Sequence, residues 1–352
     1  MSEPTPPSVS STLEYYRPLP EWAPDPPKPR YWLHILLLLA TCFTTLVMGA
    51  RMQYNFAHNR PALSFSDDPI VDESGLQETI SFFPADWVRS HPARLLGGLP
   101  FMATLMFFFL AHEMGHYLFC RRYGIYATLP FFIPVPTPIG TMGAVILIRS
   151  RIRSRTALFD IGIAGPIAGF IVALAVLVIS LTFSKPMQMG LGQPDYELGY
   201  PLIFKFVHRL LTSAGLIHGS ATLPLDHLVL HPIAIAAWVG MLATSLNLLP
   251  GGQLDGGHII FSIAPQAHKL ISRLTILVLL FMAYYLWTGW FLWAILLWLS
   301  SFRQPHVADW PRVSGGRLWL AVFALVMLLV TLTPAPLAHS SLPEVLRQFR
   351  GR

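Results

Sequence analysis

Long apolar runs constrain this chain more than any other feature. A run of about 20 apolar residues can span the roughly 30 Å of hydrocarbon in a bilayer as a helix. Such runs occupy about 31–50, 95–119, 157–184, 231–250 and 317–336. A longer run at 271–302 is interrupted by Thr288 and Gly289, which indicates two short helices joined by a tight turn. The sequence therefore predicts an all-α polytopic membrane protein with about seven transmembrane helices, or six as the alternative.

Composition agrees with a membrane class and excludes others. Of the 352 residues, 53% are hydrophobic and only 12% are charged, far from the mix of a soluble domain. The net charge is +6, but the arginines cluster beside apolar runs, so we expect no nucleic acid as a partner. The only two cysteines, Cys42 and Cys120, lie in or beside apolar segments, so disulfides cannot organise the fold.

Charge in the connections predicts the orientation. The connection 120–156 holds six arginines and no acid, whereas 51–93 holds six acids and three arginines. Because positively charged loops stay in the cytoplasm, we expect 120–156 and the N-terminus inside. Seven crossings then place 185–230 and the C-terminal tail outside. The proline-rich residues 1–30 are expected to form a disordered tail.

The connection 127–149, ATLPFFIPVPTPIGTMGAVILIR, is too apolar for an aqueous loop. Its four prolines between Pro130 and Pro138 exclude a continuous helix, and the β-branched GAVILI at 143–148 favours a strand. Irregular backbone at membrane depth is tolerated only where it packs in protein or lines a watery cavity. We therefore predict a re-entrant loop and short strand beside a polar cavity. The alternative is a hydrophobic loop lying on the membrane surface.

Three ionisable residues interrupt the run LMFFFLAHEMGHYLFC at 105–120. Such residues are costly inside a membrane and mark functional sites. On a helix, His112 and His116 lie on one face, so both imidazoles can bind one metal ion with Glu113 beside it. This HExxH pattern is typical of zinc peptidases. The alternative is a structural histidine pair that bonds to neighbouring helices.

A catalytic zinc usually takes three protein ligands and a water, so a third ligand is needed. Cys120 continues the spacing of four from His112 and His116. However, eight residues at 1.5 Å each put Cys120 about 12 Å from His112 along the helix, too far to share an ion. Cys120 is therefore interpreted as a small apolar residue at the helix end.

A better third ligand lies in NLLPGGQLDGGHI at 247–259. Asp255 directly follows an apolar segment, where a carboxylate needs a compensating cation. Pro250 and the two following glycines can end the helix and turn Asp255 back toward the bundle. The alternative is that Asp255 is the N-cap of a helix starting at Gly256. His258 is a rival ligand or, as we favour, a supporting or capping residue.

Together these elements resemble the site-2 protease family of intramembrane zinc metalloproteases. HEMGH resembles the family's HExxH, and NLLPGGQLDGG resembles its N-x-x-P-x-x-x-x-D-G element. IAGPIAGF at 163–170 resembles the glycine–proline motif in the helix between them, in the same order. The stretches GTMGAVILIRS and FDIGIAGPIAG are most similar to the plastid and bacterial EGY-type branch.

The resemblance implies a set of site residues. One Zn²⁺ per chain would be held by His112, His116 and Asp255, with Glu113 as the catalytic base. The residues implied to hold an unwound substrate strand are Asn247, Pro250, Gly143, Ala144 and Val145. Gly165 and Pro166 would pack near the site.

The implied activity is hydrolysis of a peptide bond within or near a transmembrane segment of a membrane protein, as in regulated intramembrane proteolysis. The partners would be that substrate and the lipid bilayer. We expect no PDZ domain, because the 185–230 connection has only about 45 residues, and no nucleotide-sensing domain. We expect a bacterial cytoplasmic membrane rather than a plastid one, with the site toward the cytoplasm.

The expected organisation has five parts. They are a disordered tail (1–30), a first helix with an acidic extracytoplasmic loop (31–94), a catalytic core (95–265), C-terminal transmembrane helices (266–338) and a tail (339–352). Two other functions fit parts of the pattern. A metal transporter would carry ionisable residues along several helices, but beyond this cluster and Asp160 the apolar runs have almost none. An idle scaffold would lack a ligand or the base, and none is missing.

Overall fold

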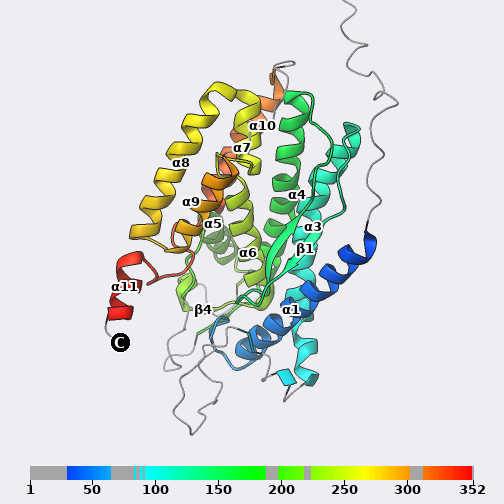
Figure 1. Ribbon diagram of the computed structural model, residues 1–352. Coiled ribbons are helices and arrows are strands. Elements are labelled where there is room, and N and C mark those ends of the chain that lie inside the picture. The colour runs from blue at the N-terminus through cyan, green and yellow to red at the C-terminus, as the bar shows by residue number, and fades with distance from the viewer. Residues whose placement is uncertain are drawn as a thin grey trace, which may run out of the picture. The chain divides into compact units, whose positions relative to one another are not determined.

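The computed structural model describes residues 30–64, 83–84, 88–89, 92–187, 197–217, 223–301 and 312–350. Residues 1–29 of the tail expected at 1–30, and most of the acidic connection, lie outside these ranges. The described chain is mostly helical (Figure 1). Its helices are α1 (Tyr31–Ala57), η2 (Pro92–Gly98), α3 (Leu99–Arg122), α4 (Arg155–Leu181), α5 (Leu202–Ser213), η3 (Leu225–His227), α6 (Pro232–Asn247), α7 (Asp255–Ile263), α8 (Pro265–Tyr285), α9 (Gly289–Ser300), α10 (Gly316–Thr331) and α11 (Leu342–Arg350).

Helices form in every apolar run, but they differ in length. Among the described residues, four helical stretches are long and apolar enough to cross a membrane: Tyr31–Ala57, Pro92–Arg122, Arg155–Leu181 and Pro265–Tyr285. The shorter apolar helices are α6, α9 and α10, of 16, 12 and 16 residues. These are about 18–24 Å long, less than the hydrocarbon thickness. Seven crossings therefore stay a prediction.

Local sequence fixes where the helices begin and break. The interruption expected at Thr288 and Gly289 does separate α8 from α9, but α8 begins already at Pro265. Proline suits the first turn of a helix, because a backbone N–H at that position would have no partner within the helix. The start of α4 is capped by Ser154, whose hydroxyl accepts a hydrogen bond from the N–H of Ala157 at 3.1 Å.

The helices α3, α4 and α6 pack against one another in the centre of the fold. Their backbones approach closely at glycines. A Cβ added to Gly115 of α3 would lie 2.6 Å from the carbonyl oxygen of Ala164 in α4. A Cβ on Gly240 of α6 would lie 2.9 Å from the ring of Phe108 in α3. Small residues at such contacts are what allow membrane helices to pack at backbone distance.

The segment 127–149 forms a β-hairpin. Its strands β1 (Phe131–Pro134) and β2 (Thr141–Val145) are antiparallel, with Phe131 opposite Val145. Two short strands, β3 (Lys185–Pro186) and β4 (Leu228–Val229), pair elsewhere. The single strand expected at 143–148 is therefore wrong in extent, since β2 ends at Val145 and a second strand, β1, precedes it. β1 can form because the prolines lie at its ends or in the turn, where pairing does not need their missing N–H.

The hairpin is held against α1 and also contacts α3. The hydroxyl of Thr44 in α1 donates a hydrogen bond to the carbonyl oxygen of Gly140, at 2.6 Å. Near the other end of the hairpin, Nδ1 of His34 lies 3.1 Å from the carbonyl oxygen of Pro130. These bonds satisfy hairpin carbonyls that β1–β2 pairing leaves free. The hairpin is thus a packed element, and its depth in the bilayer stays a prediction.

The last apolar helix, α10, is tied to the core by an ion pair. Arg317 at the start of α10 donates from Nε and Nη2 to the carboxylate of Asp160 in α4, at 2.7 and 2.8 Å. The hydroxyl of Tyr123, just after α3, donates to the same carboxylate. Asp160 lies in an apolar run outside the histidine cluster, and its carboxylate is thus paired with Arg317 and Tyr123.

Gly98 should tolerate no side chain. A Cβ at this position would lie 2.1 Å from the carbonyl oxygen of Leu46 in α1, and backbone cannot yield easily. Gly98→Ala is expected to lower the free energy of unfolding by about 1–3 kcal/mol through overpacking. Thermal unfolding in detergent measures this. Gly316→Ala is the control, because nothing lies within 4 Å of its Cβ, and an equal loss in both variants would contradict the packing argument.

Candidate active site

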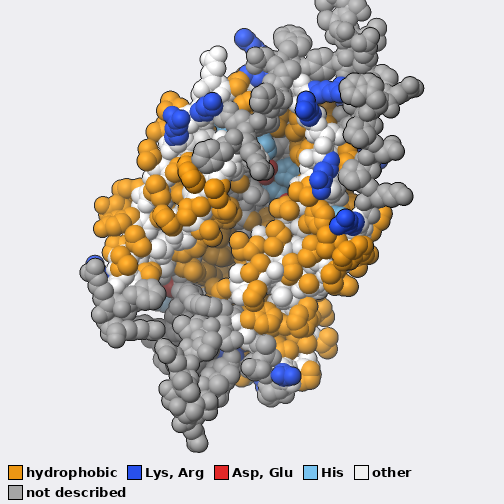
Figure 2. All heavy atoms as spheres, in the orientation of Figure 1, with side chains coloured by type: hydrophobic (Ala, Val, Ile, Leu, Met, Phe, Trp, Pro, Cys, Tyr) orange, Lys and Arg blue, Asp and Glu red, His pale blue; other side chains and the backbone are white. Residues whose placement is uncertain are grey.

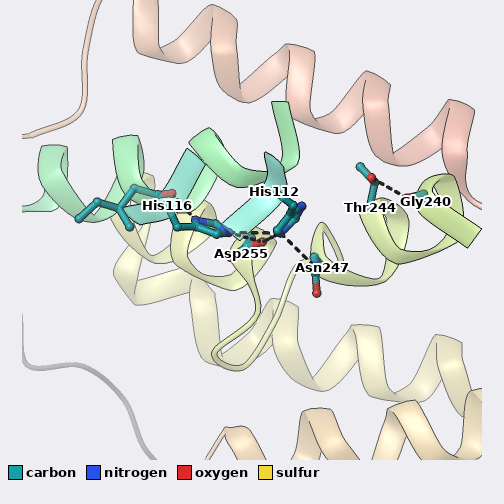
Figure 3. A network of polar contacts seen from close by, with 7 residues as sticks. His112, His116, Gly240, Thr244, Asn247 and Asp255 are labelled. Carbon is teal, nitrogen blue, oxygen red and sulfur yellow. Dashed lines mark hydrogen bonds and ion pairs between the residues drawn. The ribbon is translucent and has the colours of Figure 1, made fainter. Parts of the chain in front are cut away.

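Three ligand-type side chains converge between α3 and α7 (Figure 3). His112 and His116 come from successive turns of α3, and Asp255 is the first residue of α7. The two Nε2 atoms are 3.2 Å apart. Oδ2 of Asp255 lies 3.4 Å from Nε2 of His112 and 3.3 Å from Nε2 of His116. Both histidines are buried.

This triangle fits a tetrahedral zinc ion. Ligand atoms about 2.0–2.1 Å from a common centre stand about 3.3–3.4 Å apart in a tetrahedron. The three separations match that spacing within a few tenths of an ångström. The donor set is also right, since two imidazoles and one carboxylate are typical of catalytic zinc sites. A cation at the centre would bind the lone pairs of all three atoms at once.

A hydrogen bond on the side away from the other ligands orients the ring of His116. Its Nδ1 lies 2.7 Å from the carbonyl oxygen of Ile161 in α4, so Nδ1 carries the proton and donates it. The lone pair of Nε2 is then free to face the other two ligands. Nδ1 of His112 has no partner among the described residues, and its ring packs beside the ring of Phe108, 6.3 Å away between centroids.

Glycines of α4 make room for both rings. A Cβ on Gly165 would lie 2.1 Å from Nε2 of His116, and a Cβ on Gly169 would lie 3.0 Å from Nδ1 of His112. Pro166 lies inside α4 and is buried beside them. Gly165 therefore contacts the ligand cluster directly, as the resemblance implied for a residue near the site.

Asp255 is aimed by the turn that precedes α7. The carbonyl oxygen of Pro250 accepts a hydrogen bond from the hydroxyl of Thr275 in α8 at 3.1 Å, and Gly252 adopts a positive φ of 56°. The N-cap of α7 is Leu254, and no side chain caps it. The alternative that Asp255 is an N-cap is therefore wrong, because its carboxylate faces the imidazoles instead.

Glu113 lies next to the ligands and is 6% exposed. Its carboxylate faces the backbone N–H of Ile146, which directly follows β2. The N–H groups of Leu147 and Arg149 bond back to the first half of the hairpin, to Thr128 and Tyr126, so the N–H of Ile146 between them is turned away from it. The outer edge of the hairpin therefore passes beside the ligand cluster.

The residues expected to hold a substrate are placed differently from one another. Nδ2 of Asn247, at the end of α6, lies 3.2 Å from Nε2 of His112. Val145 at the end of β2 is 43% exposed, and Ala144 is half-buried. Gly143 is buried with a φ of 104°, against the ring of Phe109, and Pro250 lies in the turn before Asp255. Asn247 is thus the one whose side chain touches a ligand.

Three groups that lie against the site residues were not predicted from the sequence, namely the carbonyl of Ile161, the amide of Ile146 and Gly169. Backbone groups carry no side-chain signature, so nothing in the residue types marks the first two. Gly169 had a signal, because it follows Gly165 by four residues on the same helix face. His258 lies one turn after Asp255 and is outside the converging group. Cys120 is buried and unoxidised in an apolar cluster with Ile125, Ala127, Ala157 and Ile161.

Comparison with known proteins agrees with this geometry. The profile of peptidase family M50 matches residues 100–287. The chain is 32% identical over 181 residues to the probable zinc metalloprotease EGY2, chloroplastic, of Arabidopsis thaliana, covering 51% of this chain and 31% of that protein. It is 34% identical over 168 residues to EGY2 of Oryza sativa subsp. indica, covering 48% and 29%. With EGY1 of Arabidopsis thaliana it shares 25% identity over 312 residues, covering 87% and 53%.

The chain belongs to peptidase family M50, the site-2 proteases, and is similar to their EGY-type branch. Its apolar helices agree with an integral membrane protein of that zinc metalloprotease family. The matches span about a third to a half of the length of these curated relatives. Because the relatives are named as chloroplast proteins, the comparisons give no support for a bacterial cytoplasmic membrane.

Gly165→Ala tests the metal site without removing a ligand. Its Cβ would occupy the position of His116 Nε2, so the ring must leave the triangle. We expect about 10- to 100-fold weaker Zn²⁺ binding, as for loss of other supporting groups. Metal analysis after competition with a chelator measures the affinity. Gly169→Ala, with a looser 3.0 Å contact, should lose less, and unchanged binding in Gly165→Ala would argue against His116 as a ligand.

Proposed function

We propose that this protein is an intramembrane zinc metalloprotease that hydrolyses a peptide bond within or near a transmembrane segment of another membrane protein. The observation that carries the proposal is the triangle of His112, His116 and Asp255 with the carboxylate of Glu113 beside it. In this assignment, His112, His116 and Asp255 hold one Zn²⁺ per chain. Bound zinc would activate a water and polarise the scissile carbonyl.

Glu113 is the proposed general base and acid. It would take a proton from the attacking water and give it to the leaving nitrogen, so that the amine departs neutral. Its burial supports this role, because a carboxylate shielded from bulk water exchanges protons with the reacting groups rather than with solvent.

Asn247 is the proposed substrate-holding side chain. Its amide nitrogen occupies the same lone pair of His112 Nε2 that a metal ion would use. One lone pair serves one partner, so the amide would be free of His112 once that lone pair holds zinc. Its N–H could then donate to a substrate carbonyl beside the scissile bond, and thereby hold the chain in place.

The outer edge of β2 is the proposed docking edge for the substrate, with Gly143, Ala144 and Val145 along it. A helical substrate must be unwound before its carbonyls can be attacked. An exposed strand edge satisfies the freed backbone groups by strand addition. The approach of the Ile146 N–H to the Glu113 carboxylate supports this, because it puts the edge next to the proposed base.

The orientation is also part of the proposal. We keep seven crossings with the connection 120–156 on the cytoplasmic side, on the strength of its six arginines. The site lies toward the end of α3 that leads into this connection, so the product would be released there. Regulated intramembrane proteolysis is the process that such a release would serve.

Other functions find less support. Within the described residues, His112, His116 and Asp255 are the one group of three that can hold a metal. A transport path would need further sites along the helices. A catalytically idle scaffold would lack one of the ligands or the base, and all four side chains are present around one point.

Glu113→Gln should abolish cleavage and leave zinc bound. The amide keeps the shape of the side chain but cannot take a proton, so we expect a loss of at least about 100-fold in kcat. Purified protein in detergent, a reporter transmembrane substrate and metal analysis provide the measurement, with about one zinc per chain expected. Retained cleavage in this variant would overturn the mechanism.

Asn247→Ala should keep zinc and lose activity. If the amide holds a substrate carbonyl, its removal should lower kcat/KM about 10- to 100-fold, somewhat less than the loss of an oxyanion donor. Ser245→Ala, at a buried hydroxyl that bonds to Leu242 of its own helix, is the matched control on α6. Loss of zinc in Asn247→Ala would instead make the side chain a support for His112.

A further inference from the structure

Exposed cations surround the end of the bundle that holds the ligand cluster. Figure 2 shows Lys and Arg side chains on both sides of a hollow in which His and acidic side chains are visible. On one side, Arg149, Arg151 and Arg153 follow β2 at alternate positions, and all three are exposed. On the other side, α8 carries the exposed Lys269 and Arg273. These five residues are called the cationic rim below.

Both halves of the rim are fixed close to the site. The hydroxyl of Ser272, next to Arg273, accepts a hydrogen bond from the N–H of Gly252 at 3.2 Å, in the turn that aims Asp255. On the hairpin side, the N–H of Arg149 donates to the carbonyl oxygen of Tyr126 at 2.9 Å. The extended backbone of the hairpin therefore continues as far as Arg149.

The hairpin changes polarity along one continuous stretch. From Met142 to Ile148 its exposed side chains are apolar, and four of them are between 37% and 52% exposed. From Arg149 onward the exposed side chains are cationic. Ile146, whose N–H faces the carboxylate of Glu113, lies just before this change. A peptide lying along this stretch would meet apolar surface, then the proposed base, then the arginines.

The rim has no counter-charge within the part of the chain that the structure describes. None of its five residues forms an ion pair there, in contrast to Arg317, which pairs with Asp160. The positive-inside tendency explains why arginines occur in this connection. It does not explain why they directly follow the strand that passes the ligand cluster, where no carboxylate of the described residues pairs with them to offset their mutual repulsion.

We propose that the cationic rim selects substrates whose juxtamembrane segment is acidic. The proposal rests on the proposed proteolytic function and adds the substrate class. Arg149 lies three residues, or about 10 Å along extended backbone, from Ile146, and Arg151 and Arg153 follow the bend at Ser150. Carboxylates at that distance from the scissile bond, on the side that leaves the membrane, would pair with the arginines. A basic flank would be repelled.

Three reporter substrates test the charge preference. They share one transmembrane segment and differ only in a flank of glutamate, glutamine or lysine. With full-length protein in a neutral detergent, we expect the KM of the acidic substrate to be about three- to tenfold below that of the neutral one, with kcat unchanged. The basic substrate should have the highest KM. Raising the salt concentration should shrink these differences, because the rim is exposed.

Charge reversal tests the residues. Arg149→Glu, Arg151→Glu and Arg153→Glu together should invert the order of KM, so that the basic flank is preferred. If thermal unfolding shows that the triple variant is not folded, Arg151→Glu alone should change the KM values in the same direction by a smaller factor. Lys205→Glu with Arg209→Glu on α5, two exposed cations outside the rim, is the control and should keep the original order.

The neutral substrate separates the two proposals. If the neutral substrate is cleaved and the KM values of the three substrates do not differ, the rim proposal is wrong and the proteolytic function stands. If no substrate is cleaved, the result counts against the proteolytic function itself. The same assay in vesicles with and without an anionic lipid addresses headgroups as the rival occupant. If rim variants change all three substrates equally, and only with anionic lipid, the rim binds lipid and the proposal is wrong.

Discussion

Three acceptor atoms that face one another inside an apolar bundle are the constraint on which the rest of this structure depends. The Nε2 atoms of His112 and His116 and Oδ2 of Asp255 stand 3.2–3.4 Å apart. Unless a proton or a metal ion lies among them this arrangement is repulsive, and in a medium of low dielectric the repulsion is strong. The protein must therefore hold the three groups together by packing elsewhere, until a metal ion makes the triangle favourable.

The packing that holds these groups together depends on glycines, which have no side chain. Gly165 and Gly169 leave space on α4 for the imidazole rings, and Gly115 lets α3 approach the backbone of the same helix. The carbonyl of Ile161 then reaches Nδ1 of His116 directly. Because helices in lipid gain little from hydrophobic contact with one another, this close approach is a main source of their association. One set of small residues thus serves both the stability of the α3–α4 pair and the orientation of a ligand.

How far the sequence could predict this site depends on the kind of group involved. Helix rise and face alone paired His112 with His116 and excluded Cys120. Asp255 followed from the cost of a carboxylate beside an apolar segment, although the turn that aims it also fitted an N-cap. The amide of Ile146 and the carbonyl of Ile161 could not be predicted, because every residue carries the same backbone groups. The helix ends were predicted only to within a few residues: α6 ends at Asn247 and α10 at Thr331, before the apolar runs 231–250 and 317–336 end.

The hairpin joins the two halves of the proposed chemistry. The N–H of Ile146 faces the carboxylate of Glu113, and the same N–H lies on the edge that would pair with an unwound substrate. A substrate carbonyl and the carboxylate would compete for it, because one N–H serves one acceptor at full strength. Strand addition would therefore satisfy this N–H with the peptide and leave the Glu113 carboxylate free to take a proton. The edge that positions the substrate would thus also set the hydrogen-bonding state of the base.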